Sequence, residues 1–161
     1  MGNLMPNERS SLLAGRNKTP LSADDIRRAV NTFLGLDGDV NARFDPGSRT
    51  GFRLASGASG VYGEIVFGPD IYPGTSVIDP NSALSLNAAA AHELTHYYRW
   101  KDKMALAEEE LEHLDEALTS LLAISRYDRK LCDSDIRQLV ADAVQRIQLF
   151  LEGHRPEDDK P

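Results

Sequence analysis

The sequence predicts an α+β fold, in which a small, mostly antiparallel sheet packs on a central helix and two or three further helices. Glycine and proline recur at short intervals between Asp37 and Pro80 and separate short runs of strand-forming residues. The segments before and after this region instead carry apolar residues at helical spacing. The order helix, sheet, helices is typical of the α+β class, and 161 residues suffice for one buried core.

The predicted fold begins with a helix. Ser22 is a suitable N-cap, the acidic pair Asp24 and Asp25 follows in the first turn, and Gly35 ends the helix. Short strands come next, and we place them at 40–44, 51–55, 61–67 and 75–78. The tight turns between them favour antiparallel pairing.

Helices follow the predicted sheet. Asp79 can cap a helix and Pro80 suits its first position, so one continuous helix should run from there to about Lys101. A second helix covers 105–127, and a third covers 133–152. The apolar face of the third helix comprises Ile136, Leu139, Val140, Ala143, Val144, Ile147 and Phe150.

A single domain is expected over residues 20–153. Residues 1–19 are polar and contain Pro, Asn and Gly, which is typical of a flexible N-terminal arm. Residues 154–161 form an acidic C-terminal tail.

The composition argues against several classes of protein. A net charge of −7 disfavours nucleic acid as a partner, because phosphate binding requires a basic face. No apolar run approaches the ~20 residues of a membrane helix, and the N-terminus lacks the apolar core of a secretory signal. The single cysteine, Cys132, cannot form an internal disulfide and is expected to be a half-buried apolar residue. These features together predict a cytoplasmic protein.

The most informative motif is the pair His92 and His96 on the predicted central helix. Residues four apart lie on one helical face, so the two imidazoles can bind one metal ion. Glu93 is rotated by about 100° from His92, where its carboxylate can take a proton from water beside the metal. This is the chemistry of the His-Glu-x-x-His motif, and it predicts a Zn²⁺ cofactor and a catalytic Glu93.

The motif at 92–96, followed twenty residues after His96 by Asp-Glu-Ala at 115–117, resembles the thermolysin-like gluzincins. The likeness spans 92–120, and the short chain looks more like a minimal, single-domain gluzincin or the small zinc peptidases of the ImmA/IrrE group. The resemblance implies a zincin-like fold, with Glu116 as third ligand beside the two histidines and Glu93 as the base. The chain departs from the pattern at Ser120, where the family often has an aspartate that supports a ligand histidine.

Helical geometry leaves an alternative for Glu116. The main apolar stripe of its helix comprises Leu111, Leu114, Leu118, Leu121 and Leu122, and Glu116 lies on nearly the opposite side. It can reach a metal only if that side, which carries Ala117, Ser120 and Ala123, is also buried; otherwise Glu116 is a solvated surface acid. Asp115, Glu112 and His113 are lesser ligand candidates.

Residues for substrate binding are less clearly indicated. The run 61–67 is the best candidate for an edge strand that pairs with a peptide backbone, with an interior strand as the alternative. Tyr97 and Tyr98 follow the motif directly, but neither obviously shares the face of the ligands. Tyr72, Tyr127 and His154 remain as candidate donors to a developing oxyanion. Arg99 and Arg126, near helix ends, are expected to be surface or dipole-matched residues.

The sequence therefore predicts a zinc metallopeptidase that hydrolyses a protein or peptide substrate. A non-peptidase zinc amidohydrolase could use the same ligands. A zinc-bearing binding or regulatory module without turnover is the third reading. An intact Glu93 favours catalysis, because a purely structural zinc site does not need a base.

Overall fold

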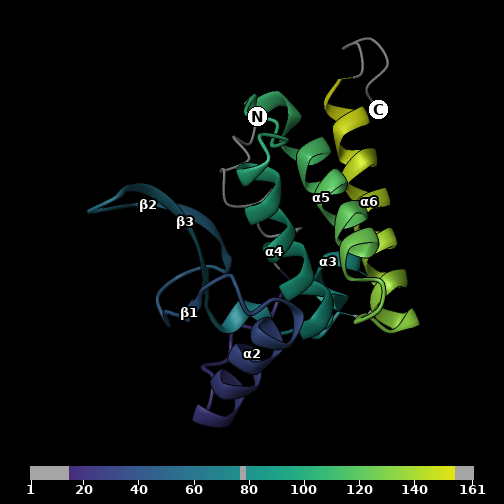
Figure 1. Ribbon diagram of the computed structural model, residues 1–161. Coiled ribbons are helices and arrows are strands. Elements are labelled where there is room, and N and C mark those ends of the chain that lie inside the picture. Colours follow the sequence, from purple (N-terminus) through teal and green to yellow (C-terminus); the bar gives the residue numbers. More distant parts are fainter. Residues whose placement is uncertain (1–14, 77–78, 155–161) are drawn as a thin grey trace, which may run out of the picture.

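Residues 15–76 and 79–154 are described by the computed structural model shown in Figure 1. Their α-helices are α2 (Ala23–Leu36), α3 (Pro80–Ala83), α4 (Leu86–Lys101), α5 (Glu112–Tyr127) and α6 (Asp133–Gly153). Their strands are β1 (Ala42–Phe44), β2 (Gly51–Gly57) and β3 (Gly60–Phe67), and two 3₁₀ turns are η1 (Pro69–Ile71) and η2 (Glu109–Leu111). The predicted α+β class is confirmed.

The sheet is mixed and has the strand order β1-β3-β2. β2 and β3 pair antiparallel along their length, as predicted, whereas β1 runs parallel to β3 and pairs only with residues 65–67. The prediction that 61–67 forms an edge strand is therefore wrong for residues 65–67, which lie between the other two strands, whereas 61–64 pair with β2 alone. In the fourth predicted strand, Thr75 and Ser76 are not extended in a sheet, and 77–78 lie outside the described residues.

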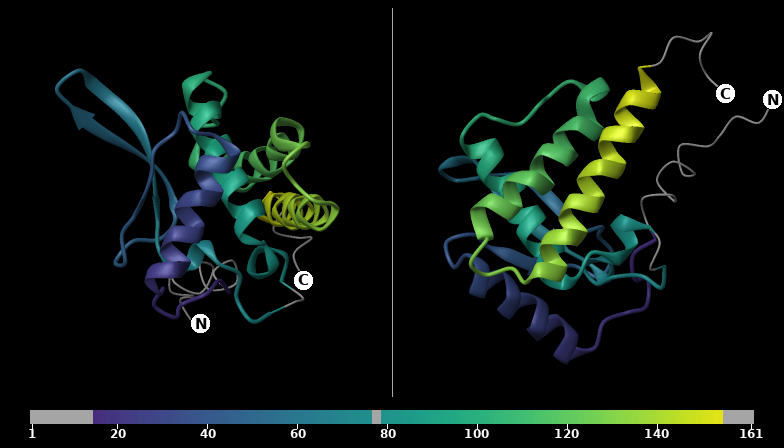
Figure 2. Two further views of the ribbon diagram at one scale, coloured as in Figure 1. Left: turned by 60° about the horizontal axis from the view of Figure 1, so that its bottom comes forward. Right: turned by 90° about the vertical axis from the view of Figure 1, so that its right-hand side faces the viewer.

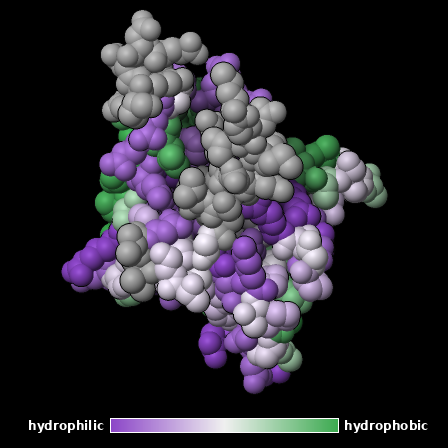
Figure 3. Space-filling model, turned by 180° about the vertical axis from the view of Figure 1, so that it is seen from behind, coloured by the Kyte–Doolittle hydropathy of each residue, from purple (hydrophilic) through white to green (hydrophobic). Residues whose placement is uncertain are grey.

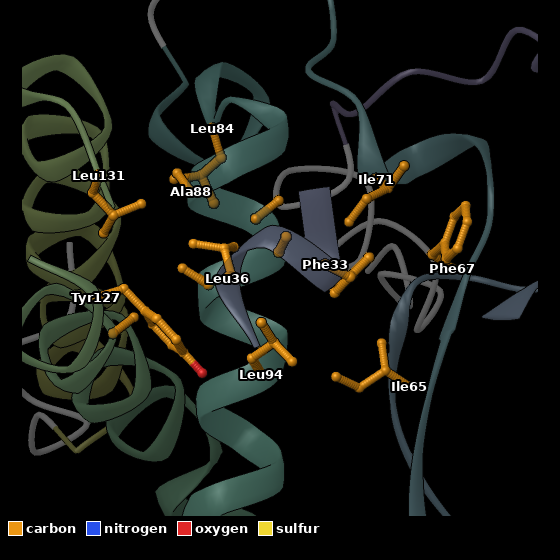
Figure 4. Close-up of a cluster of buried hydrophobic side chains, with 14 of the residues drawn as sticks. Phe33, Leu36, Ile65, Phe67, Ile71, Leu84, Ala88, Leu94, Tyr127 and Leu131 are labelled. Carbon is orange, nitrogen blue, oxygen red and sulfur yellow. The ribbon is translucent and has the colours of Figure 1, made fainter. Parts of the chain in front are cut away.

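α4 lies in the middle of the molecule, with the sheet on one side and the α5–α6 pair on the other (Figures 1 and 2). The four consecutive alanines 88–91 on α4 are buried, and small side chains allow this close approach from both sides. The largest core side chains come from α2, β3 and η1, and Figure 4 shows them grouped around α4. This packing fixes the helix that carries the histidine motif.

The predicted continuous helix from Pro80 to Lys101 is in fact two helices. Leu84 adopts a non-helical conformation after α3, and Ser85 starts α4 by accepting a hydrogen bond from the Ala88 amide. The backbone groups freed at the break form hydrogen bonds with residues that are distant in the sequence. The carbonyl of Leu84 accepts a 2.6 Å bond from Arg16, and the Ser85 amide donates to Gln138 on α6 at 2.8 Å.

The last residues of the predicted arm, 15–19, pack against the domain. Arg16 donates to the carbonyls of Asp70, Ile71, Asn81 and Leu84 at 2.6–2.9 Å. Gly15 approaches Gly74 so closely that a Cβ on Gly74 would lie 1.5 Å from the Gly15 oxygen. Residues 1–14 of the predicted arm and residues 155–161 of the predicted tail lie outside the described residues.

α5 buries the face opposite to its leucines. Ala117, Thr119, Ser120 and Ala123 are fully buried, whereas Leu118 and Leu121 are 36% and 41% exposed. The prediction that the leucine stripe is the main buried face is therefore wrong, since the small side chains allow α5 to approach α4 and α6. This choice of face turns Glu116 inward.

Several hydrophobic side chains are exposed at the surface. Leu54, Val61 and Tyr62 lie on the β2–β3 hairpin, which projects from the body and appears at the right of Figure 3. Cys132 is exposed rather than half-buried. Within 15–76 and 79–154, every helix is too short or too polar to cross a membrane.

Candidate metal centre

Three side chains predicted as metal ligands converge between α4 and α5. One ligand atom from each of His92, His96 and Glu116 lies within 4.8 Å of the others. The Nε2 atoms of His92 and His96 lie 2.8 Å and 3.2 Å from Oε2 of Glu116. The reading of Glu116 as a solvated surface acid is therefore wrong, because its carboxylate faces both imidazoles.

The tautomer of His92 follows from its neighbours. Its Nδ1 lies 2.8 Å from the Ser120 hydroxyl, and that hydroxyl donates to the carboxylate of Asp142 at 2.7 Å. A serine hydroxyl has one proton, so Ser120 can only accept from His92. The Nδ1 of His92 must therefore carry a hydrogen, and a neutral ring leaves a free lone pair on Nε2.

The tautomer of His96 follows from its neighbours in the same way. Its Nδ1 lies 3.5 Å from the Thr119 hydroxyl, which donates its proton to the carbonyl of Asp115 at 2.8 Å. Arg99 donates to the same hydroxyl at 2.8 Å, so Thr119 is an acceptor toward the imidazole. Both histidines thus direct Nε2 toward Glu116.

This arrangement fits a cation. Two imidazole lone pairs and a carboxylate repel one another at these distances unless a proton or a metal ion lies between them. Burial lowers the pKa of His96, but the Glu116 carboxylate outweighs it and raises that pKa above its usual value. Burial likewise opposes ionisation of Glu116, yet His96 and His92 hold its pKa well below the usual range. Two histidines and a glutamate are a typical ligand set for catalytic zinc.

Glu93 lies beside this centre but outside the cluster of converging ligand atoms. It lines the same cleft as His92 and Glu116. Its Oε2 atom is buried and has no hydrogen-bond partner among the described residues. A buried carboxylate oxygen without a donor is costly, and a water molecule that Glu93 can deprotonate would supply one.

The centre opens into a cleft of about 930 Å³. α4 contributes Ala89, His92 and Glu93, and the opposite helices contribute residues of the first turns of α5 together with Arg146 of α6. The segment 16–18 and the loop 46–50 also line the cleft, and Pro69, Asp70, Asn81 and Leu84 complete the lining. Asp70 ties these two segments together, since its carbonyl accepts from Arg16 and its carboxylate accepts from the Thr50 amide at 2.9 Å.

The lesser ligand candidates are not drawn into the cluster. Asp115 is held by Arg99 at 2.6 Å and by the Leu106 amide at 2.8 Å. Arg99 is only 4% exposed, so it is not a surface residue; it lies in the last turn of α4, as the dipole-matched alternative requires, and it joins α4 to α5. Glu112 and His113 line the cleft without joining the three ligand atoms. Arg126, by contrast, is exposed and stacks over Tyr98 at 3.4 Å.

The candidate oxyanion donors all lie away from the cleft. The hydroxyls of Tyr72 and Tyr98 bond to the Asp25 carbonyl and the Asp37 carboxylate, and His154 bonds to the Phe150 carbonyl. Tyr97 packs against Phe52 and Trp100, and Tyr127 is buried in the core. The side chains with nitrogen donors that α5 and α6 contribute to the cleft, apart from the ligands, are instead His113 and Arg146.

Two functional candidates on α6 were missed from the sequence. Asp142 is fully buried and Arg146 lies 3.8 Å from Glu116. A signal was present, because Asp135, Leu139, Asp142 and Arg146 have helical spacing and share one face. An acid and a base within such a stripe indicate a buried polar layer.

Comparison of the chain with protein-family models, with curated proteins and with solved structures found no match.

Proposed function

We propose that this chain is a zinc-dependent metallopeptidase of gluzincin type, with His92, His96 and Glu116 as ligands. The observation that carries the proposal is the convergence of the Nε2 atoms of two histidines on one carboxylate, with all three ligand atoms within 4.8 Å. The unpartnered oxygen of Glu93 in the same cleft supports hydrolysis rather than a structural site, in which the motif glutamate has no role.

The chain's own residues supply the acid–base chemistry. A bound zinc ion provides Lewis acidity, which acidifies water and polarises a carbonyl. Glu93 accepts the proton of the attacking water and then delivers it to the leaving amine. Arg146, whose guanidinium lies near Glu116 in the cleft, is a cationic donor suited to the developing oxyanion.

The size of the cleft favours a peptide over a small amide. Its volume of about 930 Å³ is at the upper end of typical small-molecule sites, which span roughly 300–1,000 Å³. It is also lined by seven separate parts of the described chain, so several substrate residues can be contacted at once.

The test separates metal binding from turnover. Purified protein should contain about one zinc per chain. His92→Ala and His96→Ala should lose the metal, whereas His154→Ala, which changes an exposed histidine outside the cleft, should keep it. Full zinc retention in both motif variants would contradict the ligand assignment.

Glu93→Gln keeps the shape of the side chain and removes the base. Zinc content and stability should stay close to wild type, while cleavage of a peptide library should fall by about 10²–10⁴-fold. Equal cleavage by the two proteins means that Glu93 is not the base. If neither protein cleaves but both bind zinc and the same partner, a zinc-bearing binding module is the better description.

A further inference from the structure

We propose that Asp142 of α6 is the positioning residue of the metal centre, fixing His92 through Ser120 and holding Arg146 beside Glu116. This inference rests on the proposed metal centre and adds a third helix to it. The ligands themselves come from α4 and α5 alone.

Asp142 is buried in a way that demands partners. The residue has no exposed surface, and an isolated carboxylate is strongly disfavoured in such a place. Its Oδ2 accepts from the Ser120 hydroxyl at 2.7 Å and from Nε of Arg146 at 3.1 Å. The carboxylate is thus neutralised on one side by a cation and directed on the other toward the metal centre.

The serine carries the influence of this carboxylate to His92. Ser120 is also fully buried, so water cannot compete for its hydroxyl. Because the hydroxyl proton is committed to Asp142, the oxygen must accept Nδ1–H of His92 at 2.8 Å. A carboxylate behind a hydroxyl strengthens that acceptor and fixes both the ring orientation and the tautomer.

This relay accounts for the serine at position 120. Where the resembling family places an aspartate one turn after the glutamate ligand, this chain places a hydroxyl and takes the charge from the next helix. The missing negative charge is therefore present in the fold, at Asp142.

The same carboxylate of Asp142 also acts, through Arg146, on the glutamate ligand of α5. Arg146 lies one turn after Asp142, and its bond to Asp142 directs NH1 to within 3.8 Å of Oε2 of Glu116. One residue of α6 thereby sets a histidine ligand on α4 and the cation beside the glutamate ligand on α5.

The test uses full-length Asp142→Asn with Asp135→Asn as its matched control. Asp135 is also buried on α6, at 3% exposure, but bonds to Ser85 and to the Cys132 amide, away from the ligands. Zinc affinity, measured by competition with a chromophoric chelator, should fall about 10–100-fold in Asp142→Asn and stay unchanged in Asp135→Asn. An equal loss in both variants, or none in either, would overturn the proposal.

A spectroscopic readout distinguishes positioning from general destabilisation. In the zinc-loaded wild type and in Asp135→Asn, the Nδ1–H proton of His92 should give a slowly exchanging NMR signal. The signal should be lost in Asp142→Asn and in Ser120→Ala, which breaks the relay while leaving the acid in place. A signal that persists in either variant contradicts the relay.

The exchange variant Ser120→Asp/Asp142→Ser keeps both groups and moves the charge next to His92. It should recover most of the zinc affinity that Asp142→Asn loses, whereas failure of the folded variant to recover any argues against the carboxylate. Absence of zinc binding by the wild type defeats the metal centre itself. Tight binding by wild type and Asp142→Asn alike defeats only the role of Asp142.

Discussion

Neighbouring acids on α5 have different roles because a single arginine distinguishes them. Arg99 holds Asp115 from α4, with NH1 bonded to its carboxylate and to its carbonyl at 2.6 Å and 2.8 Å. Glu116, one residue later, points to the imidazoles. The ion pair links α5 to α4 and thereby favours Glu116 over Asp115 as the proposed third ligand.

Substitution of these two acids should therefore have different effects. Glu116→Ala should weaken zinc binding by more than the ~10–100-fold typical of outer residues, because it removes a ligand. Asp115→Ala should leave Arg99 buried without its partner and cost about 3–5 kcal/mol of unfolding free energy. Isothermal titration with zinc and urea unfolding of the metal-free proteins measure the two effects. A larger loss of zinc affinity in Asp115→Ala would mean that α5 is rotated from the arrangement described.

At the scale of elements, the break between α3 and α4 sets the residue at which α4 begins. Ser85 restarts the helix, and its hydroxyl bonds to Asp135 of α6 while also capping the Ala88 amide. Arg16 also stabilises the break, since its guanidinium donates hydrogen bonds to four carbonyls, which lie on η1, on α3 and at the break itself. Burial lowers the pKa of Arg16 to about 10, against the opposing effect of Asp70.

Arg16→Ala should destabilise the protein by about 2–4 kcal/mol, because it leaves buried carbonyls without donors. Arg16→Lys should recover only part of this loss, since an ammonium cannot reproduce the planar fork. Arg27→Ala is the control, as Arg27 forms only an exposed pair with Asp24. Urea unfolding followed by circular dichroism measures each value, and equal stability of Arg16→Ala and Arg27→Ala would contradict the anchoring role.

At the scale of the whole molecule, the His92, His96 and Glu116 cluster joins the α4 side of the core to α5. Without a metal, the ion pair between His96 and Glu116 holds α4 and α5 together. The raised pKa of His96 adds stability that is complete below about 6.5 and is lost as the pH rises through the raised value. The lowered pKa of Glu116 adds stability that is present above about 4.5 and is lost as the pH falls through the lowered value.

The melting temperature of the metal-free protein should therefore fall as the pH rises from about 6.5 into the alkaline range. Added zinc replaces the proton between the ligands, so its stabilising effect should grow over the same range and reach about 2.7 kcal/mol at a hundredfold excess over Kd. Glu116→Gln should flatten both dependences. Calorimetry with chelator and with zinc provides the measurement, and a metal-free melting temperature that does not vary with pH would contradict the coupling.

The sequence by itself determined those features that depend on local spacing. Capping at Ser22 and apolar periodicity placed α2 and α6 to within one or two residues, because the first turn and the helical repeat involve neighbours in the chain. Spacing alone also put His92 and His96 on one face and Glu93 beside it. Glu116 was reached by family resemblance, and local spacing left its orientation open.

Only the tertiary structure decided which faces are buried and which distant groups meet. Arg16 breaks a helix whose local signals are continuous, because its hydrogen bonds reach carbonyls 65 and 68 residues away. The small-residue face of α5 is buried in place of its leucines, because close helix packing depends on the shape of both partners. The Asp142–Ser120–His92 chain joins three helices, and the helical spacing of Asp142 in the sequence does not tell which residue of another helix it bonds to.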